Sequence, residues 1–237
     1  MTENIKDFNN WIPEVVSILD RDWKARYTEA ERDIIAKVKE KLTEKSKVNI
    51  LDYGCGTGRF CGILQRELGH DFVFINYTGV DGSTAMIDKA KENNPYNEAL
   101  DINFFHVSEY QKNTDYDIVV SIDVIQHQEN PLEYLEKIFA ENPEADKFII
   151  GWHSQSTKAG IIHFHNKYPF WEGTYSEDDI KEMADKVEAS YKIYQKASLP
   201  HDFIITKSGV PVKTNGISGW LPDLKEVTEK PKTKKKV

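Results

Sequence analysis

The sequence predicts an α/β fold: a doubly wound, mostly parallel sheet of seven strands with helices on both faces. Two observations lead to this class. First, short apolar segments alternate with longer amphipathic ones along most of the chain, which is typical of strands joined by helices. Second, Leu51–Gly58 runs from an apolar segment into three alternating glycines, a strand-to-helix turn of the kind that binds nucleotides. The 237 residues, 39% of them hydrophobic, suffice for one sizeable core.

The expected strands follow the apolar runs, and the expected helices follow the amphipathic segments between them. Seven strands are predicted near residues 48–53, 73–80, 102–107, 117–122, 146–151, 190–197 and 201–207. The helices of the same core are predicted near residues 57–69, 83–93, 130–141 and 177–189. This alternation of strand and helix is typical of a parallel sheet whose connections cross over its faces.

The glycine-rich turn narrows the choice of ligand. Gly54, Gly56 and Gly58 have no Cβ atom, so the backbone can bend tightly and a ligand can lie against its N–H groups. A dinucleotide site needs its third glycine at the sixth position, where Arg59 stands when the count begins at Gly54. A phosphate-binding loop needs Gly-Lys-Ser or Gly-Lys-Thr, but Gly58 is followed by Arg59 and Phe60. Both of these ligand classes are therefore disfavoured.

A carboxylate follows the second predicted strand. The apolar run Phe72–Val80 ends in Asp81, which lies 23 residues after Gly58. Ribose-binding carboxylates lie about 20 residues beyond such a turn, at the end of the second strand. Asp81 is therefore expected to accept hydrogen bonds from both ribose hydroxyls. Its alternative role is to cap the next helix, for which Ser83 is also available.

With these residues the chain resembles the class I S-adenosylmethionine-dependent methyltransferases, whose first motif is an acidic residue followed by Gly-x-Gly-x-Gly. The resemblance implies S-adenosyl-L-methionine as cofactor, and it implies that the last two strands pair as an antiparallel hairpin at one edge of the sheet. The cofactor contacts that it implies in the core are Asp52, Gly54, Cys55, Gly56, Gly58, Asp81, Gly82, Ser108 and Ile122. Ser108 stands where many members place an aspartate that receives the adenine amino group, so its hydroxyl or a backbone group is expected to serve instead.

The resemblance also places the carboxyl ends of the fourth and fifth strands near both cofactor and substrate. Asp123 follows the fourth strand and is expected to orient the substrate or to hold an amine. His153, at the end of the fifth strand, and His165 are the candidates for a general base. His127 is expected to pack and hydrogen-bond structurally, as a histidine at this place often does in the family.

The segments around the core predict the domain organisation. Residues 1–45 are expected to form an N-terminal helical cap, residues 46–207 the cofactor-binding core, and residues 208–237 an irregular tail that ends in a disordered, lysine-rich segment. In the cap, Tyr27 is the candidate for a cofactor contact and Trp23 for a substrate contact. The alternative is that both aromatic rings only pack the cap on the sheet.

A long connection, residues 152–176, is expected to form a lid over the substrate, because long connections in compact domains are usually functional. Its candidate substrate contacts are Trp152, Tyr168 and Trp171. The lid histidines also raise the question of a metal site. No metal is predicted, because no acidic residue recurs beside them at ligand spacing and methyl transfer needs none.

Charge and hydropathy limit the partners. The net charge is −8, and the rest of the chain is more acidic still when the lysines of residues 230–237 are set aside, so nucleic acid is not an expected substrate. The sequence has neither an apolar run of about 18 residues nor the layout of a signal peptide, so a cytoplasmic protein without a membrane partner is expected. The two cysteines are expected to be reduced. A monomer or a homodimer is expected.

Methyl transfer from a sulfonium requires in-line positioning and removal of a proton from the attacking atom. The preferred interpretation is an enzyme that methylates the oxygen or nitrogen of a small polar metabolite, with oxygen favoured because histidines flank the expected pocket. One alternative is methylation of a protein side chain or N-terminus, which an acidic groove would suit. The other is a non-catalytic regulatory or scaffold protein that keeps the same fold and cofactor.

Overall fold

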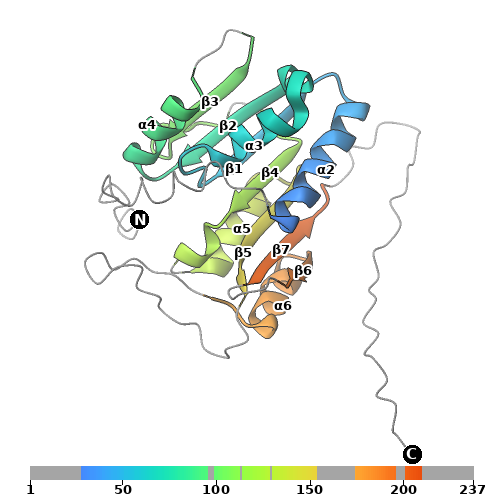
Figure 1. Cartoon of the computed structure of the whole chain (residues 1–237). Coiled ribbons are helices and arrows are strands. Elements are labelled where there is room, and N and C mark those ends of the chain that lie inside the picture. The colour runs from blue at the N-terminus through green and yellow to red at the C-terminus, as the bar shows by residue number, and fades with distance from the viewer. Residues whose placement is uncertain are drawn as a thin grey trace, which may run out of the picture.

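A computed structural model describes residues 28–95, 99–112, 114–128, 130–153, 174–195 and 201–209. In these residues one seven-stranded sheet is formed by β1 (Val48–Tyr53), β2 (Ile75–Asp81), β3 (Asp101–His106), β4 (Ile118–Ile122), β5 (Asp146–His153), β6 (Ser190–Tyr194) and β7 (His201–Lys207). The strand order is β3-β2-β1-β4-β5-β7-β6 (Figure 1). β7 runs antiparallel to both of its neighbours, and the pairs from β3 to β5 are all parallel. The mostly parallel sheet and its antiparallel edge hairpin are confirmed.

Helices cover both faces of this sheet, as predicted. They are α2 (Glu29–Glu44), α3 (Arg59–Leu68), α4 (Thr84–Asn93), α5 (Pro131–Glu141) and α6 (Glu177–Lys186), with short 3₁₀ helices η3 (Gly69–Phe74) and η4 (Ile125–His127). Buried residues of α2, α3 and α4 share one core cluster, and those of α5 and α6 share the other. Ser83 caps α4 by accepting from the Met86 amide, which is the role the sequence analysis left open for it.

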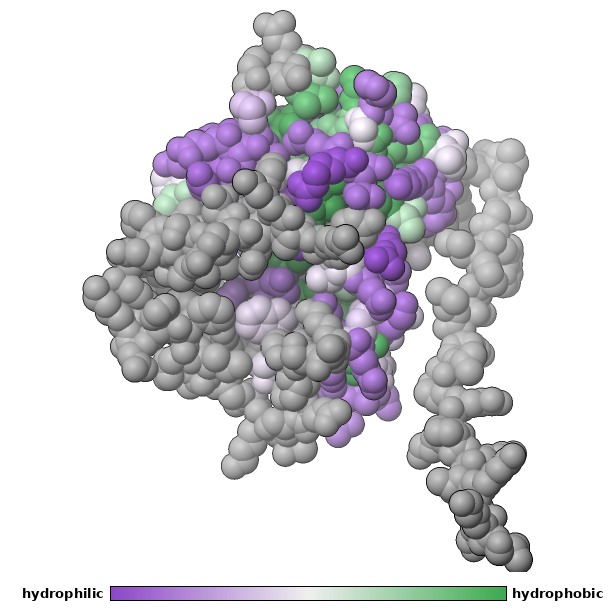
Figure 2. All heavy atoms as spheres, in the orientation of Figure 1, coloured by the Kyte–Doolittle hydropathy of each residue, from purple (hydrophilic) through white to green (hydrophobic). Residues whose placement is uncertain are grey.

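The two clusters follow from the alternation of side chains along each strand. On β1, Ile50 packs into the cluster under α2, α3 and α4, and the next residue, Leu51, packs into the cluster under α5 and α6. Val119 and Val120 divide in the same way on β4. Strands buried on both faces therefore appear in the sequence as continuous apolar runs. Hydrophilic side chains dominate much of the visible described surface (Figure 2).

Several boundaries differ from the predicted ones by one to three residues; the strand predicted for residues 190–197, for example, ends at Tyr194. The strand predicted from residue 73 begins at Ile75, because the chain leaves α3 through Gly69, with φ 55° and ψ −120°, and continues as η3. Val73 and Phe74 are 43% and 49% exposed, so their apolar character does not mark a buried strand. The helix predicted for residues 177–189 ends at Lys186. β5 extends to His153, so the first two residues of the predicted lid belong to the sheet.

The parallel strands bring their carboxyl ends to one edge of the sheet. The residues that follow β1, β2 and β4 therefore lie close together, although they are far apart in the sequence. The amide of Gly54, after β1, donates to Val80 of β2 at 2.7 Å, and the amide of Asp123, after β4, donates to Ile150 of β5 at 3.1 Å. This edge holds the candidate site. None of the described helices is both long and apolar enough to span a membrane.

Candidate active site

The glycine turn between β1 and α3 uses backbone conformations that favour glycine. Gly54, Gly56 and Gly58 have φ values of 74°, 53° and 76°, all in the left-handed region. The amides of Gly54 and Cys55 both donate to the carbonyl of Val80, at 2.7 and 3.1 Å, which fixes the turn to the end of β2. α3 then begins with no side-chain cap, so the first amides of the helix are available to an anionic group.

The three glycines differ in what surrounds them. A Cβ atom on Gly54 would lie 2.2 Å from a methyl group of Val124, and one on Gly58 would lie 2.4 Å from the side-chain amide nitrogen of Asn94. These two glycines are needed for packing. A Cβ on Gly56 would meet no atom of the described residues within 4 Å. At Gly56 the turn therefore opens onto space in which a ligand can lie against the backbone.

Asp81 lies directly beside this opening. Its Oδ2 accepts from the amide of Gly56 at 2.9 Å, and its Oδ1 accepts from the amide of Ser83 at 2.8 Å. Burial raises the pKa of the Asp81 carboxyl, against the lowering effect of these amide bonds. Each carboxylate oxygen has a second lone pair, so Asp81 can still accept hydrogen bonds from a ligand. Asp81 therefore lies beside the glycine turn, and its binding of a ribose stays a prediction.

At the end of β3 the structure adds a histidine that the sequence analysis missed. His106 pairs with Asp81 across the β2–β3 ladder, and its Nε2 lies 3.0 Å from the carbonyl oxygen of Gly82. Its Nδ1 lies 2.7 Å from Oγ of Ser108, which is exposed. The predicted adenine contact Ser108 is therefore already engaged with His106. His106 was missed because its pairing with Asp81 and its contact with Gly82 depend on strand register, which the local sequence does not show.

Asp52, the acidic residue of the glycine motif, is 2% exposed and lies one residue before the end of β1. Its Oδ2 accepts a hydrogen bond from the hydroxyl of Tyr77 on β2. Its Oδ1 is buried and has no hydrogen-bond partner among the described residues. Burial raises the pKa of Asp52 to about 7, against the lowering effect of the Tyr77 hydrogen bond. Tyr77 was not predicted as a site residue.

A second unpredicted pair fixes α2 to the start of α3. Glu31 is 1% exposed and forms a capping box with Thr28 at the first turn of α2. The same carboxylate binds both terminal nitrogens of Arg59, the residue after Gly58, and the contact from Nη2 to Oε2 is 2.9 Å. This bidentate geometry is specific to a guanidinium and a carboxylate. It couples the cap helix to the glycine turn.

The acceptor side of the edge is built around Asp123. This residue has φ 58°, an uncommon left-handed backbone for a residue other than glycine, and such strain clusters at functional sites. Its Oδ1 accepts from the indole nitrogen of Trp152 on β5 at 3.0 Å. The ring of Trp152 meets the ring of His127 edge-on, with centroids 6.4 Å apart. Asp123 and Trp152, both predicted site residues, are therefore brought together.

His153 ends β5 and is buried, with 7% of its surface exposed. Its Nδ1 lies 3.0 Å from the carbonyl oxygen of Tyr175, to which it donates. Its ring stacks on that of His201, with centroids 5.9 Å apart. The Nδ1–H donor leaves Nε2 as the acceptor of the neutral ring, which is the form that a general base requires.

Several predicted site residues lie outside the described part of the chain, namely Trp23, Tyr27, His165, Tyr168 and Trp171. Within the described part, no group of three or more histidine, cysteine or acidic residues is arranged to hold a metal ion. Cys55 and Cys61 are free and buried there, and burial raises the pKa of both thiols, that of Cys61 to about 12.

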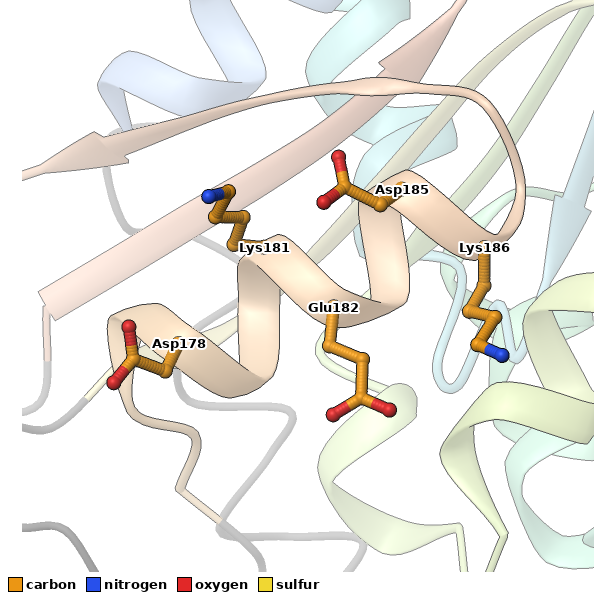
Figure 3. A pocket seen from close by; sticks show the side chains of 5 residues that line it. All are labelled: Asp178, Lys181, Glu182, Asp185 and Lys186. Carbon is orange, nitrogen blue, oxygen red and sulfur yellow. The ribbon is translucent and has the colours of Figure 1, made fainter.

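A hollow on α6 is a different feature from this edge. Figure 3 shows that charged side chains of that single helix line it, namely Asp178, Lys181, Glu182, Asp185 and Lys186. It contains no residue of the glycine turn and none from the carboxyl end of a strand. Charged side chains spread along one exposed helix face are typical of a solvated surface. The candidate site is therefore the strand edge.

Comparison with known proteins identifies the family of the chain. A family model described as "Methyltransferase domain" matches residues 23–165, more than half of the chain. The chain belongs to this family. The matched residues include every element of the methyltransferase domain from α2 to β5, and hence the glycine turn, Asp81 and Asp123.

Named relatives of this methyltransferase-domain protein come from Rickettsia. The "Ubiquinone biosynthesis O-methyltransferase" of Rickettsia canadensis (strain McKiel) is 31% identical over 197 residues, which cover 81% of this chain and 73% of the relative. The protein of the same name from Rickettsia bellii (strain OSU 85-389) is 31% identical over 135 residues. The match covers 54% of this chain and 52% of that relative, so the chain spans about half the length of the R. bellii protein.

Solved structures share the fold. The plantazolicin methyltransferase BpumL, whose structure is described as a complex with SAH, superposes with a TM-score of 0.53 at 19% sequence identity. The match covers 81% of this chain and 90% of that one. At this identity the superposition supports the α/β methyltransferase fold, in agreement with the strand order.

Proposed function

We propose that this protein binds S-adenosyl-L-methionine at the glycine turn and transfers its methyl group to the oxygen of a small polar molecule. The observation that carries the proposal is the open space at Gly56 beside Asp81. The amide nitrogen of Gly56 donates to Oδ2 of Asp81 at 2.9 Å. A backbone that a ligand can approach, beside a carboxylate at the end of the second strand, suits an adenosine with a free ribose. The SAH bound in the BpumL complex supports this choice of cofactor.

The cofactor side divides into three parts. Asp81 accepts hydrogen bonds from the ribose hydroxyls, and the uncapped first turn of α3 holds the methionine carboxylate. Asp52 offers its unpaired buried oxygen to a donor of the cofactor. The remaining contacts proposed from the family resemblance are Cys55, Gly82, Ser108, Ile122 and Tyr27.

The acceptor side lies at the ends of β4 and β5. When bound, the cofactor supplies a methyl group that its sulfonium has already activated. His153 takes the proton from the attacking hydroxyl at Nε2, since Nδ1 is held by the carbonyl of Tyr175 at 3.0 Å. Asp123, fixed by the indole of Trp152, orients the acceptor. Oxygen is favoured as the accepting atom because the named Rickettsia relatives are O-methyltransferases.

Transfer of label from S-adenosyl-[methyl-³H]methionine tests this function. The protein is incubated with a panel of small phenols, alcohols and amines, and in parallel with a peptide library. Label in a small hydroxyl compound supports the proposal. Label confined to peptides, or no label in any acceptor despite cofactor binding, contradicts it and favours a protein methyltransferase or a non-catalytic protein.

Variants of one histidine test the base. His153→Ala should lower kcat by about 10²- to 10⁴-fold, the usual contribution of a general base, and should leave the affinity for S-adenosylhomocysteine unchanged. His70→Ala is the matched control, because His70 is an exposed histidine of η3. An unchanged kcat in His153→Ala would exclude His153 as the base.

A further inference from the structure

Tyr77 holds a buried carboxylate in one orientation. Its side chain is fully buried on β2, and its hydroxyl donates to Oδ2 of Asp52 on the neighbouring strand β1. The ring is packed against Phe104 of β3, with centroids 5.9 Å apart, so the hydroxyl has little freedom to turn away. Oδ1 of Asp52 is buried and receives no hydrogen bond from any described residue. One oxygen of this carboxylate is thus fixed, and the other is left for a donor from outside the described chain.

The charges around Asp52 show what kind of donor this oxygen suits. Two further carboxylates act on it, Asp81 from β2 and Glu31 from α2, and both raise its pKa. Arg59 of α3 lowers it, but Arg59 already gives both terminal nitrogens to Glu31. The remaining titratable groups that interact with Asp52 are Tyr77, Cys55, Cys61 and, from α5, Tyr134.

These four remaining groups stay neutral near pH 7, because burial raises the pKa of each. The surroundings of Asp52 are therefore rich in negative charge, and their positive charge is engaged elsewhere. An unpaired buried carboxylate oxygen in such surroundings favours a cationic donor.

We propose that Tyr77 is a positioning residue of the cofactor site, which fixes Asp52 so that its free oxygen receives the α-ammonium group of the cofactor's methionine part. This inference rests on the proposed function, because it assumes that the ligand is S-adenosylmethionine or its product. Tyr77 does not touch the ligand. It acts through Asp52, by orienting the carboxylate and by stabilising its charged form.

The proposal predicts how cofactor affinity depends on pH. The α-ammonium group binds the ionised form of Asp52, whose pKa is about 7, so affinity should fall as the pH drops through 7. Without the Tyr77 hydroxyl, the charged form of Asp52 loses its hydrogen bond and the pKa rises further. The fall in affinity then begins at a higher pH. Below that pH, each unit by which the pKa of Asp52 rises weakens binding by about tenfold.

The experiment is calorimetric titration of S-adenosylhomocysteine, which carries the same α-ammonium group, into the full chain at pH 6.0 to 8.5. The variants are Tyr77→Phe, Asp52→Asn and the double variant. Tyr194→Phe is the matched control, since its hydroxyl also donates to an aspartate, Asp33, but between β6 and α2. Thermal unfolding of each variant checks that it is folded.

Three results together support the proposal. Tyr77→Phe displaces the affinity profile to higher pH, Asp52→Asn flattens it, and adding Tyr77→Phe to Asp52→Asn changes affinity no further. Tyr194→Phe keeps the profile of the wild type. An equal loss of affinity at every pH in Tyr77→Phe, or no loss, would overturn the positioning role.

Two further results complete the test. If Tyr77→Phe fails to fold, the profile of Asp52→Asn decides alone, and a pH dependence like that of the wild type overturns the proposal. If the wild type binds no S-adenosylhomocysteine at any pH, the proposed function itself is refuted. If the wild type binds and Tyr77→Phe leaves the pH profile of affinity unchanged, only the positioning role of Tyr77 is refuted.

Discussion

Alanine substitutions at three glycines of positive φ separate ligand binding from folding. Gly56 and Gly69 have nearly the same φ, 53° and 55°, and a Cβ atom on either would meet no atom of the described part of the chain within 4 Å. Gly56 belongs to the glycine turn, and Gly69 lies at the far end of α3. Gly54 has φ 74°, and its added Cβ would lie 2.2 Å from Val124. Gly69→Ala therefore also places an alanine at a positive φ, with ψ −120°, without touching the proposed cofactor site.

The structure gives the magnitudes. Gly69→Ala should cost at least as much as Gly56→Ala, because φ 55° with ψ −120° lies outside the left-handed well. A left-handed conformation costs an alanine about 1–2 kcal/mol, so Gly56→Ala should lower the free energy of unfolding by that amount. For a domain of this size this corresponds to a fall in Tm of roughly 2–8 °C. Gly54→Ala adds the cost of overpacking against Val124, about 1–3 kcal/mol, and should lose roughly 2–5 kcal/mol in all.

Thermal unfolding and calorimetric titration with S-adenosylhomocysteine provide the assay. Gly56→Ala should remain folded but lose at least about tenfold in affinity, because the new methyl group fills the space of the ligand. Gly69→Ala should lose at least as much stability and bind as the wild type does. Wild-type affinity in Gly56→Ala would refute the argument that the ligand lies against this open face of the turn.

Three further predictions concern buried charges. Glu31→Gln should lower the free energy of unfolding by about 3 kcal/mol, as measured by urea titration. This value is the lower end of the range for a broken buried ion pair, because Arg59 keeps some access to water. An unchanged urea midpoint would contradict a structural role for the pair. Asp52 has a folded-state pKa raised to about 7, so its contribution to apo-protein stability is present below pH 4 and is lost as the pH rises through 7. Asp52→Asn should accordingly raise the Tm of the apo protein at pH 8, and a lower Tm there would argue against this sign. Burial lowers the pKa of Lys147 to about 8, so the folded state disfavours the charged form and the stability of the protein should rise between pH 8 and 10.5. Thermal melts of Lys147→Met over this pH range should not show the rise. A rise retained in full would assign it to another group.

Most of the fold could be predicted because the signals that define it are local. The central strands β1, β4 and β5 are buried on both faces and appear as apolar runs, and the glycine turn marks the first crossover. The start of β2 was missed for a physical reason. Val73 and Phe74 are apolar but lie exposed in a 3₁₀ helix, which backbone geometry at Gly69 sets up and which hydropathy does not reveal.

The candidate site was predicted only where spacing along the chain carries it. Asp81 was found because a strand and a helix of ordinary length separate it from the glycine turn. The bond from Tyr77 to Asp52 depends on strand register, in which Tyr77 pairs with Ile50 and its long side chain reaches two residues further along β1. The ion pair of Glu31 and Arg59 depends on how α2 packs against α3. Neither contact has a signature in the local sequence.

The most direct test of the account is calorimetric titration of S-adenosylmethionine, S-adenosylhomocysteine and NADH into the wild type and into Asp81→Ala. The wild type should bind both sulfur nucleosides with a Kd on the order of micromolar, Asp81→Ala should weaken both by at least about tenfold, and NADH should give no binding heat with either protein. Binding of NADH in place of the sulfur nucleosides, or full affinity in Asp81→Ala, would contradict a sulfur-nucleoside site at Asp81.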